Sequence, residues 1–308
     1  MHSEKMLPDL NASMESLKEF ADVGVIITDL DGTIVAQGED VFGQLKSIQN
    51  KWKHKRLTYT IATGRTYAGA KKIAQELCLK NIPIALYNGA VVLKYKTKQI
   101  IDRKTISNSV LFNLCGLIDM QQQYLLAYYL LPVREYGIVE MVHGFGKHVF
   151  DYDVNGMKIV WHNCFEEITV TETSSGQNML PDATCEPCSI LLDMQMIKRE
   201  NRQLIEYLER CTLASSTCSG HGFWEICARG VNKSVILQHL KYGKCVAIGD
   251  NDNDTALLEA AEIGVAVGNG SPSAKHVAKY ICREDGVQGV LELINTIQEA
   301  KRYWGQET

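Results

Sequence analysis

The sequence predicts an α/β protein in which a parallel sheet is interrupted by an inserted α+β domain. Residues 24–88 alternate strand-like and helix-like segments, and residues 232–300 alternate in the same way. Residues 91–220, which lie between them, follow a different pattern. Alternation of strands and helices is typical of parallel sheets with right-handed crossovers. We therefore expect the two outer stretches to form one sheet domain and the middle stretch to form another.

Five alternating segments make up the first outer stretch. Short apolar runs rich in β-branched residues at 24–28, 57–63 and 82–88 predict buried strands. Residues 40–53 and 66–79 have apolar positions at the spacing that is typical of helices. The order strand, helix, strand, helix, strand predicts a parallel sheet whose crossovers contain the helices.

The second outer stretch repeats this alternation. Its predicted strands are short apolar runs, and its predicted helices have amphipathic spacing. In chain order these are a helix at 232–243, a strand at 245–250, a helix at 253–263, a strand and turn at 264–270, and helices at 271–280 and 286–300. We expect these elements to join the sheet that residues 24–88 begin.

The middle of the chain has the pattern of an α+β insertion. Residues 90–106 alternate like a β-hairpin, and strand-like runs at 190–196 and 222–228 flank a helix near 199–211. This pattern predicts three parts of the chain. They are a core domain from 21–90 and 221–308, an inserted domain at 91–220, and an N-terminal extension at 1–20.

Composition excludes several classes of protein. The 308 residues have a formal net charge of −4, with 45% hydrophobic and 22% charged residues, as in ordinary globular proteins. Nucleic-acid binding is not expected, because phosphate backbones select basic surfaces. No run of 18 apolar residues occurs, so we expect no membrane span. The first 20 residues lack the apolar core of a secretory signal, which favours a cytoplasmic protein; the oligomeric state stays open.

Ten cysteines are scattered along the chain, and Cys185 and Cys188 form its one CxxC pair. Such a pair can hold zinc or cycle as a dithiol. No second pair follows at the spacing of a zinc site. We therefore expect reduced, partly buried thiols rather than a metal or redox centre.

Four short polar segments follow predicted strands or begin a helix, at the sheet edge where α/β proteins bind ligands. They are "DLDGT" at 29–33, "ATGR" at 62–65, Lys233 within "GVNKS", and "GDNDND" at 249–254. Each alone has an ordinary explanation. Asp-Gly is a common turn, Asn253 and Asp254 can cap the following helix, and Lys233 can be a solvated charge. Their occurrence together in this order is far more specific.

Together these segments resemble the haloacid dehalogenase superfamily of phosphohydrolases, and most closely its Cof-type branch. "YNGAVV" at 87–92 and "GVAVGNGSPSAKHVAKYI" at 264–281 are also similar to that branch. The resemblance covers residues 22–298 apart from the middle of the insertion. It implies a Rossmann-like parallel sheet with helices on both faces, and it makes residues 91–220 a cap that determines substrate specificity.

The resemblance also implies catalytic and metal-binding roles. Asp29 would be the nucleophile that forms an aspartyl-phosphate, and Asp31 would be the general acid and then the general base. Mg²⁺ would be held by Asp29, the main-chain carbonyl of Asp31 and Asp250, because it takes oxygen ligands. Asn253 and Asp254 would orient these ligands or their waters from a second shell.

Four further residues are implied to bind the phosphate group. Thr63 would donate a hydrogen bond to a phosphoryl oxygen, and Lys233 would pair with Asp29 and the phosphate as a point charge. Gly64 would allow the backbone to approach closely before a helix that opens near Arg65 and favours an anion. A surface ion pair remains an equal alternative for Arg65.

We therefore expect a Mg²⁺-dependent phosphatase that acts on small phosphorylated metabolites, such as sugar phosphates. One alternative is a phosphomutase of the phosphomannomutase type, which shares the nucleophile; the other is a non-catalytic ligand-binding scaffold. The scaffold is disfavoured because Asp31, Lys233 and Asp250 are all present. The mutase is disfavoured because the insertion is poor in arginine, with only Arg103, Arg134, Arg199, Arg202 and Arg210.

Overall fold

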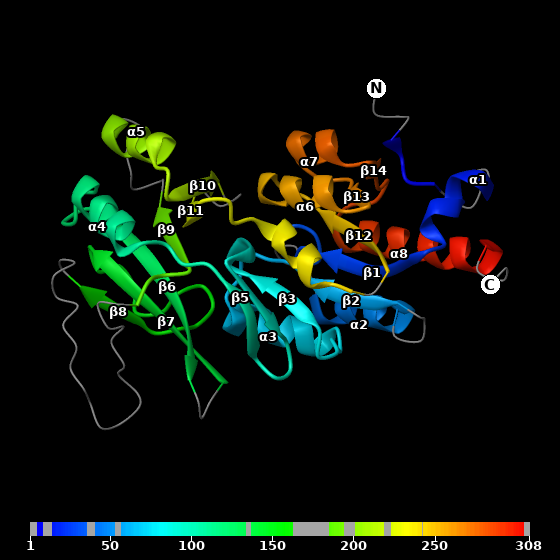
Figure 1. Ribbon diagram of the computed structural model, residues 1–308, viewed down its shortest axis with the longest axis horizontal. Helices are drawn as coiled ribbons and strands as arrows, with labels where there is room; N and C mark the ends of the chain where they lie inside the picture. The colour runs from blue at the N-terminus through cyan, green and yellow to red at the C-terminus, as the bar shows by residue number, and fades with distance from the viewer. Residues whose placement is uncertain are drawn as a thin grey trace. The chain divides into compact units, whose positions relative to one another are not determined.

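The computed structural model divides into two compact units by the contacts between its residues. The core unit comprises Met1–Gly64, Ala70–Thr97 and Asn232–Thr308, and the inserted unit comprises Arg65–Gly69 and Lys98–Val231. Figure 1 labels the elements of both units. The structure describes residues 5–8, 14–35, 41–52, 57–133, 137–162, 185–193, 201–218, 223–241 and 243–304.

A five-stranded parallel sheet forms the centre of the core unit, in the order β14-β13-β12-β1-β2 (Figure 1). The strands are β1 (Val23–Thr28), β2 (Thr58–Ile61), β12 (Lys244–Gly249), β13 (Ile263–Ala266) and β14 (Tyr280–Ile281). Their side chains are almost all buried, as expected for parallel strands covered on both faces. Thr28 is level with Ile61 on one side and Ile248 on the other, so the carboxyl ends of three strands coincide.

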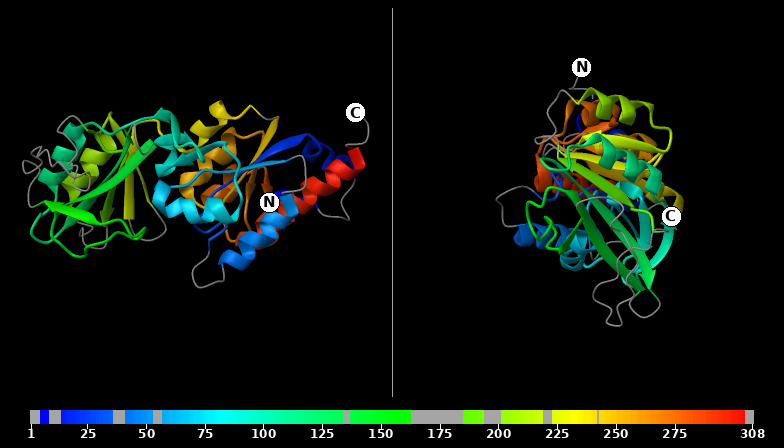
Figure 2. Two further views of the ribbon diagram at one scale, coloured as in Figure 1. Left: turned by 90° about the horizontal axis from the view of Figure 1, so that it is seen from below. Right: turned by 90° about the vertical axis from the view of Figure 1, so that its left-hand side faces the viewer.

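Helices pack on both faces of this sheet, as the sequence predicts. They are α2 (Val41–Trp52), α3 (Tyr67–Glu76), α6 (Thr255–Ala260), α7 (Pro272–Val277) and α8 (Gly286–Trp304). On one face, apolar side chains of β1, β12 and β13 pack against Leu257 and Leu258 of α6 and Ala274 of α7. Helix α8 runs beside α2 (Figure 2).

Shorter helical turns complete the core unit: α1 (Met14–Leu17), η2 (Lys18–Phe20), η3 (Tyr87–Gly89), η5 (Lys233–His239) and η6 (Asp252–Asp254). The helix predicted at 232–243 is the 3-10 helix η5 and ends earlier than predicted. It begins where the side chain of Asn232 accepts a hydrogen bond from the N–H of Ser234. This cap fixes Lys233 as the first helical residue.

The third predicted strand differs from the expectation in its pairing. Strand β3 (Pro83–Leu86) pairs antiparallel with β4 (Val91–Lys94), and only an isolated parallel bridge joins Ala62 to Ala85 next to the main sheet. The physical reason is the η3 turn, whose left-handed Asn88 reverses the chain immediately after β3. The prediction of a regular parallel strand at 82–88 was therefore wrong in its partner, although the strand exists.

The inserted unit contains a six-stranded sheet in the order β10-β11-β9-β6-β7-β8, antiparallel except for the β7–β8 pair. Helices α4 and α5 pack on one face through a cluster that includes Leu114, Leu204 and Phe145. The α+β character of the insertion is confirmed. Its elements are β5 (Gln99–Arg103), α4 (Asn108–Leu117), β6 (Tyr124–Val133), β7 (Gly137–Gly146), β8 (Ile159–His162), β9 (Ser189–Asp193), α5 (Arg202–Arg210), β10 (Ala214–Cys218) and β11 (Phe223–Ala228).

Two of the five counted arginines, Arg134 and Arg199, lie outside the described residues. Arg202 and Arg210 are the first and last residues of α5, and Arg103 donates a hydrogen bond to the carbonyl of Leu130. No helix among the described residues is both long and apolar enough to cross a membrane.

The N-terminal residues 5–8 cover the outer edge of the core sheet. Met6 forms a parallel bridge with Ile281 of β14, and the N–H of Leu7 donates to the carbonyl of Ile281 at 2.8 Å. Leu7 is fully buried. Pairing of this edge strand satisfies backbone groups that would otherwise be open to other chains.

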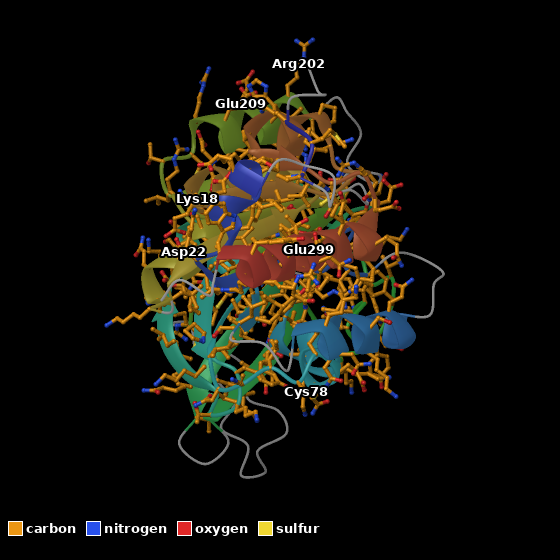
Figure 3. The ribbon with its side chains drawn as sticks, turned by 90° about the vertical axis from the view of Figure 1, so that its right-hand side faces the viewer. Lys18, Asp22, Cys78, Arg202, Glu209 and Glu299 are labelled. Atoms are coloured by element: carbon orange, nitrogen blue, oxygen red, sulfur yellow. The ribbon has the colours of Figure 1, made fainter. Side chains whose placement is uncertain are left out.

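The following short helices extend the N-terminal segment along the core unit. The ammonium group of Lys18 lies 5.1 Å from the ring centroid of Trp304, the last residue of α8. Figure 3 shows Lys18 and Asp22 on the same face of the molecule as Glu299 of α8. The described residues of the N-terminal extension, 5–8 and 14–20, are therefore a structural part of the core unit.

Replacing Leu7 by alanine tests this assignment. The change should lower the free energy of unfolding by about 2–4 kcal/mol, because it removes a fully buried side chain and leaves a cavity. Urea unfolding measures the effect. The matched control is Leu213→Ala, at a side chain that is 55% exposed, with an expected change below about 0.5 kcal/mol. Equal losses in the two variants would contradict the assignment.

Candidate active site

Two neighbouring strands deliver one aspartate each to the same edge of the sheet. Asp29 follows the last residue of β1, and Asp250 follows the last residue of β12. The N–H of Asp29 donates to the carbonyl of Ile248 at 3.0 Å, which continues the β1–β12 ladder to the carboxylate. The backbone therefore holds both carboxylates rigidly and side by side.

A buried lysine bridges two carboxylates at this edge. Lys233 Nζ lies 2.8 Å from Asp29 Oδ1 and 2.6 Å from Asp254 Oδ1. The side chains of Lys233 and Asp254 are fully buried, and that of Asp29 is almost so. Charged groups are costly to bury unless they are paired and hydrogen-bonded. This arrangement pairs the lysine on two sides.

The second oxygen of Asp254 is also committed to the protein. Asp254 Oδ2 accepts hydrogen bonds from the backbone N–H groups of Asp250 and Asn251, at 3.0 and 3.1 Å. Both oxygens of Asp254 therefore have donors, one an ammonium group and the other two amides. Its contacts suit a residue that holds Lys233 and the loop after β12 in place.

The DLDGT turn brings a further residue to Asp250. Gly32 has a left-handed φ of +83°, and a Cβ at this position would come within 2.2 Å of Asp250 Oδ2. The hydroxyl of Thr33 donates to Asp250 Oδ1 at 2.7 Å. No role was predicted for Thr33, whose only signal in the sequence is its place in the DLDGT segment. The structure makes it the residue that orients Asp250.

The carboxylates outnumber the cation that compensates them. Asp29, Asp250 and Asp254 each place an oxygen within 4.8 Å of the others, and Lys233 supplies one positive charge. Burial, and then the carboxylate of Asp254, raises the pKa of Asp29 well above its ordinary value, despite Lys233. Burial raises the pKa of Asp250 to about 6, and the negative charge of Asp254 adds to the shift.

The pKa of Lys233 is raised as well, and for a lysine this favours the charged form. Burial alone would lower its pKa, but the carboxylates of Asp254 and Asp29 raise the pKa above its ordinary value. Lys233 is therefore a permanent cation at this edge. One ammonium group cannot balance three carboxyl groups if all of them ionise, and a divalent cation at this edge would favour their ionised forms.

The residues present fit a hard divalent cation. Among the described residues, Asp29 Oδ2 and Asp250 Oδ2 receive no hydrogen bond from the protein, whereas both Asp254 oxygens do. Oxygen-only ligands are those that Mg²⁺ prefers. Asn253 Oδ1 is buried and has no partner among the described residues, so it is an acceptor available to a water or ligand. The geometry thus favours Asp29 and Asp250 as the side-chain ligands.

Four further candidate residues were predicted from the sequence: Asp31, Thr63, Gly64 and Arg65. Thr63 is fully buried and lies two residues after β2, so it comes to the same sheet edge as Asp29. Asp31 is exposed and already outside β1, and its charge contributes to the raised pKa of Asp250. Gly64 follows Thr63, whereas Arg65 belongs by its contacts to the inserted unit and donates to the carbonyl of Gly69.

The backbone groups of the CxxC pair, Cys185 and Cys188, form hydrogen bonds within the inserted unit. Cys188 is buried and donates its N–H to the carbonyl of Tyr128, and the carbonyl of Cys185 accepts from the side chain of Asn108. Burial raises the pKa of the Cys188 thiol to about 11, so it stays protonated at neutral pH. All cysteines whose side chains the structure describes are free.

The site described so far has a buried Lys–Asp pair, a second aspartate at a strand end and a polar loop after β12. A comparison with known families shows which class of protein has this site. A model of the haloacid dehalogenase-like hydrolases matches residues 26–294. The chain therefore belongs to the haloacid dehalogenase-like hydrolase family, which confirms the family resemblance drawn from the sequence.

Relatives and solved structures agree with this membership. The chain is 25% identical over 290 residues to the 5-amino-6-(5-phospho-D-ribitylamino)uracil phosphatase YitU of Bacillus subtilis, covering 87% of this chain and 96% of that protein. A HAD/COF-like hydrolase from Plasmodium vivax has the same fold, with a TM-score of 0.70, 18% identity, and coverage of 93% and 99% of the two chains. A HAD subclass IIB sugar phosphatase matches with a TM-score of 0.65, 18% identity, and coverage of 92% and 99%.

Asp250→Asn should stabilise the metal-free protein at neutral pH. A carboxyl whose pKa rises from 3.8 to about 6 on folding binds more protons in the folded state between these values, so its contribution to stability falls as pH rises. The variant should gain about 1–3 kcal/mol at pH 7 over wild type and nothing at pH 4. Unfolding in EDTA at both pH values measures this.

The exposed carboxylate of Glu259 on α6 supplies the matched control, as Glu259→Gln. This variant should show no gain at either pH, since its carboxyl is not buried. A stability difference for Asp250→Asn that is the same at pH 4 and pH 7 would contradict the charge excess.

Proposed function

We propose that this phosphatase of the haloacid dehalogenase-like family hydrolyses small phosphorylated metabolites through an aspartyl-phosphate on Asp29, with Mg²⁺ as cofactor. The observation that carries the proposal is the Lys233 bridge between Asp29 and Asp254. It fixes one oxygen of Asp29 and leaves Oδ2 without a donor among the described residues. A carboxylate oxygen that is held but not hydrogen-bonded is suited to attack phosphorus.

In the proposed first step, Asp29 Oδ2 attacks the phosphorus atom of the ester and the bond to the ester oxygen breaks. The electron pair of the broken bond stays on the leaving oxygen, which takes a proton from Asp31 as it leaves as an alcohol. In the second step water attacks the phosphorus, its proton passes to Asp31, and Asp29 leaves as a carboxylate. The exposure of Asp31 supports its role, because its carboxyl can reach both substrate and water.

Asp29 and Asp250 would hold Mg²⁺ by their side chains, together with the main-chain carbonyl of Asp31. When bound, the ion supplies positive charge against the phosphoryl oxygens and the surrounding carboxylates. Lys233 adds a fixed charge, and Thr63, Gly64 and Arg65 complete the proposed phosphate-binding set. Asp254 and Asn253 are proposed to orient this machinery through Lys233, the backbone and their own oxygens.

The names of relatives support small, hydroxyl-rich phosphate esters as the substrate class. One relative is named as a phosphatase of a phosphoribitylamino compound, and one structural neighbour is titled a sugar phosphatase. We propose that residues 91–220 select among such esters, since none of the proposed catalytic residues lies there. Nothing among the described residues favours the phosphomutase alternative. Arg202 and Arg210 are exposed at the two ends of α5, and Arg103 donates to the carbonyl of Leu130.

The direct experiment is a screen of phosphate esters for release of inorganic phosphate with and without Mg²⁺. EDTA should stop hydrolysis and Mg²⁺ should restore it. Ca²⁺ should inhibit, because its longer bonds and higher coordination number suit the in-line reaction poorly. Full activity in thoroughly chelated protein would overturn the metal assignment.

Asp29→Asn should abolish turnover while the protein stays folded. The amide is nearly isosteric with the carboxylate but cannot attack phosphorus or balance a metal charge. The loss in kcat should be at least about 10³-fold, the scale on which single essential groups act. Steady-state kinetics with a folded variant decides the matter, and near-normal turnover would rule out Asp29 as nucleophile.

Asp31→Asn should slow esters according to their leaving groups. Sugar phosphates have poor leaving groups that need protonation, so they should lose the most, whereas an activated aryl phosphate should lose much less. The measurement compares kcat/KM for both ester types in wild type and variant. If both fall equally, Asp31 acts through metal or phosphate binding and is not the general acid.

A further inference from the structure

The η3 turn, Tyr87–Gly89, contacts the segments that carry Thr63 and Lys233, two of the proposed phosphate-binding residues. The N–H of Asn88 donates to the carbonyl of Thr63 at 3.0 Å, next to the end of β2. Gly89 lies against the backbone of Asn232, the cap of η5, so closely that a Cβ would stand 2.2 Å from its carbonyl oxygen. The turn thus touches the loop after β2 and the start of the helix that carries the lysine.

The backbone of this turn is in a conformation that few residues adopt. Tyr87 and Asn88 are consecutive left-handed residues, with φ of 51° and 54°, and both are buried. Left-handed backbone at non-glycine residues is uncommon, with Asn among the more tolerant types, and it clusters at functional sites. Contacts of the surrounding structure therefore have to hold Tyr87 and Asn88 in this conformation.

The side chain of Asn88 makes a third connection, to the loop after β12. Asn88 Oδ1 accepts a hydrogen bond from Asn253 Nδ2 at 3.2 Å. Because the amide nitrogen of Asn253 is used in this way, its Oδ1 must point elsewhere. That oxygen is buried and has no hydrogen-bond partner among the described residues. A buried amide oxygen left without a donor indicates that the donor comes from outside the protein.

We propose that Asn88 is a positioning residue that fixes the carboxamide of Asn253, so that Asn253 Oδ1 accepts a hydrogen bond from the water shell of the Mg²⁺ ion. The inference rests on the proposed function, since it assumes a cation at Asp29 and Asp250. Mg²⁺ keeps several waters when protein carboxylates bind it, and these waters are donors. Groups that orient such ligands are worth about 10–100-fold in metal affinity.

The test measures metal binding directly, by calorimetric titration of the metal-free protein with MgCl₂. Asn88→Gly retains the left-handed backbone and removes the acceptor, and it should weaken Mg²⁺ binding about 10-fold. Asn88→Asp keeps an acceptor oxygen in a residue that tolerates the same backbone, and it should stay within about 3-fold of wild type. Asn253→Ala leaves the turn intact and should lose as much as Asn88→Gly.

Cys78→Gly is the matched control, because Cys78 is a left-handed residue of the core unit, with φ of 50°, and is exposed. It should leave Mg²⁺ affinity unchanged. Combining Asn88→Gly with Asn253→Ala should add no further loss, since both act through one carboxamide.

Wild-type affinity in folded Asn88→Gly or in Asn253→Ala would overturn the proposal, as would additive losses in the double variant. If Asn88→Gly does not fold, Asn253→Ala alone decides. Failure of the proposed function would look different, because wild-type protein itself would then bind no Mg²⁺ or release no phosphate.

Discussion

Two carboxylates share one buried ammonium group at the carboxyl edge of the core sheet, and the geometry of the site depends on this pairing. Removing Lys233 would leave two buried carboxylates without their cation, which is strongly destabilising. The lysine holds Asp29 through one oxygen and Asp254 through one oxygen. It therefore links the first strand of the sheet to a loop more than two hundred residues later, and it holds one of the two oxygens of Asp29.

Backbone pairing and the turn after β1 position Asp250, which Lys233 does not contact. Parallel pairing of β1 with β12 aligns the ends of two strands that are far apart in the sequence, so the backbone brings Asp29 and Asp250 together. Gly32 allows the turn after β1 to pass close to Asp250, and Thr33 orients that carboxylate. The remaining negative charge is a property of the folded site. Burial raises the pKa values of Asp29 and Asp250, and a cation bound between their carboxylates would offset this cost.

The sequence allowed prediction of the sheet, the two strand-end aspartates and the lysine, because each follows a clear strand or begins a capped helix. It could not show that Asp254 accepts backbone hydrogen bonds on one oxygen while it holds Lys233 with the other, since those contacts depend on how the loop after β12 folds. Thr33 was missed for a similar reason. A threonine after Asp-Gly has no distinctive pattern until its partner 217 residues away is in place.

The inserted unit was harder to predict than the core. The ten-residue strands β6 and β7 were not predicted, because β6 is buried on both faces over most of its length and lacks the alternation that reveals a strand. Strand β3 was predicted, and β4 lies within the hairpin predicted at 90–106. Their antiparallel pairing was not predicted, because the left-handed turn that reverses the chain depends on tertiary contacts of Asn88.

A crystal structure of the protein with Mg²⁺ and beryllium fluoride tests the central claim most directly. Beryllium fluoride mimics a phosphoryl group by bonding to a carboxylate oxygen that can act as nucleophile. We expect beryllium to be bound to Asp29 Oδ2 while Lys233 Nζ stays on Asp29 Oδ1. Beryllium bound to Asp31 or Asp250, or to Asp29 with Lys233 displaced from it, would contradict the account.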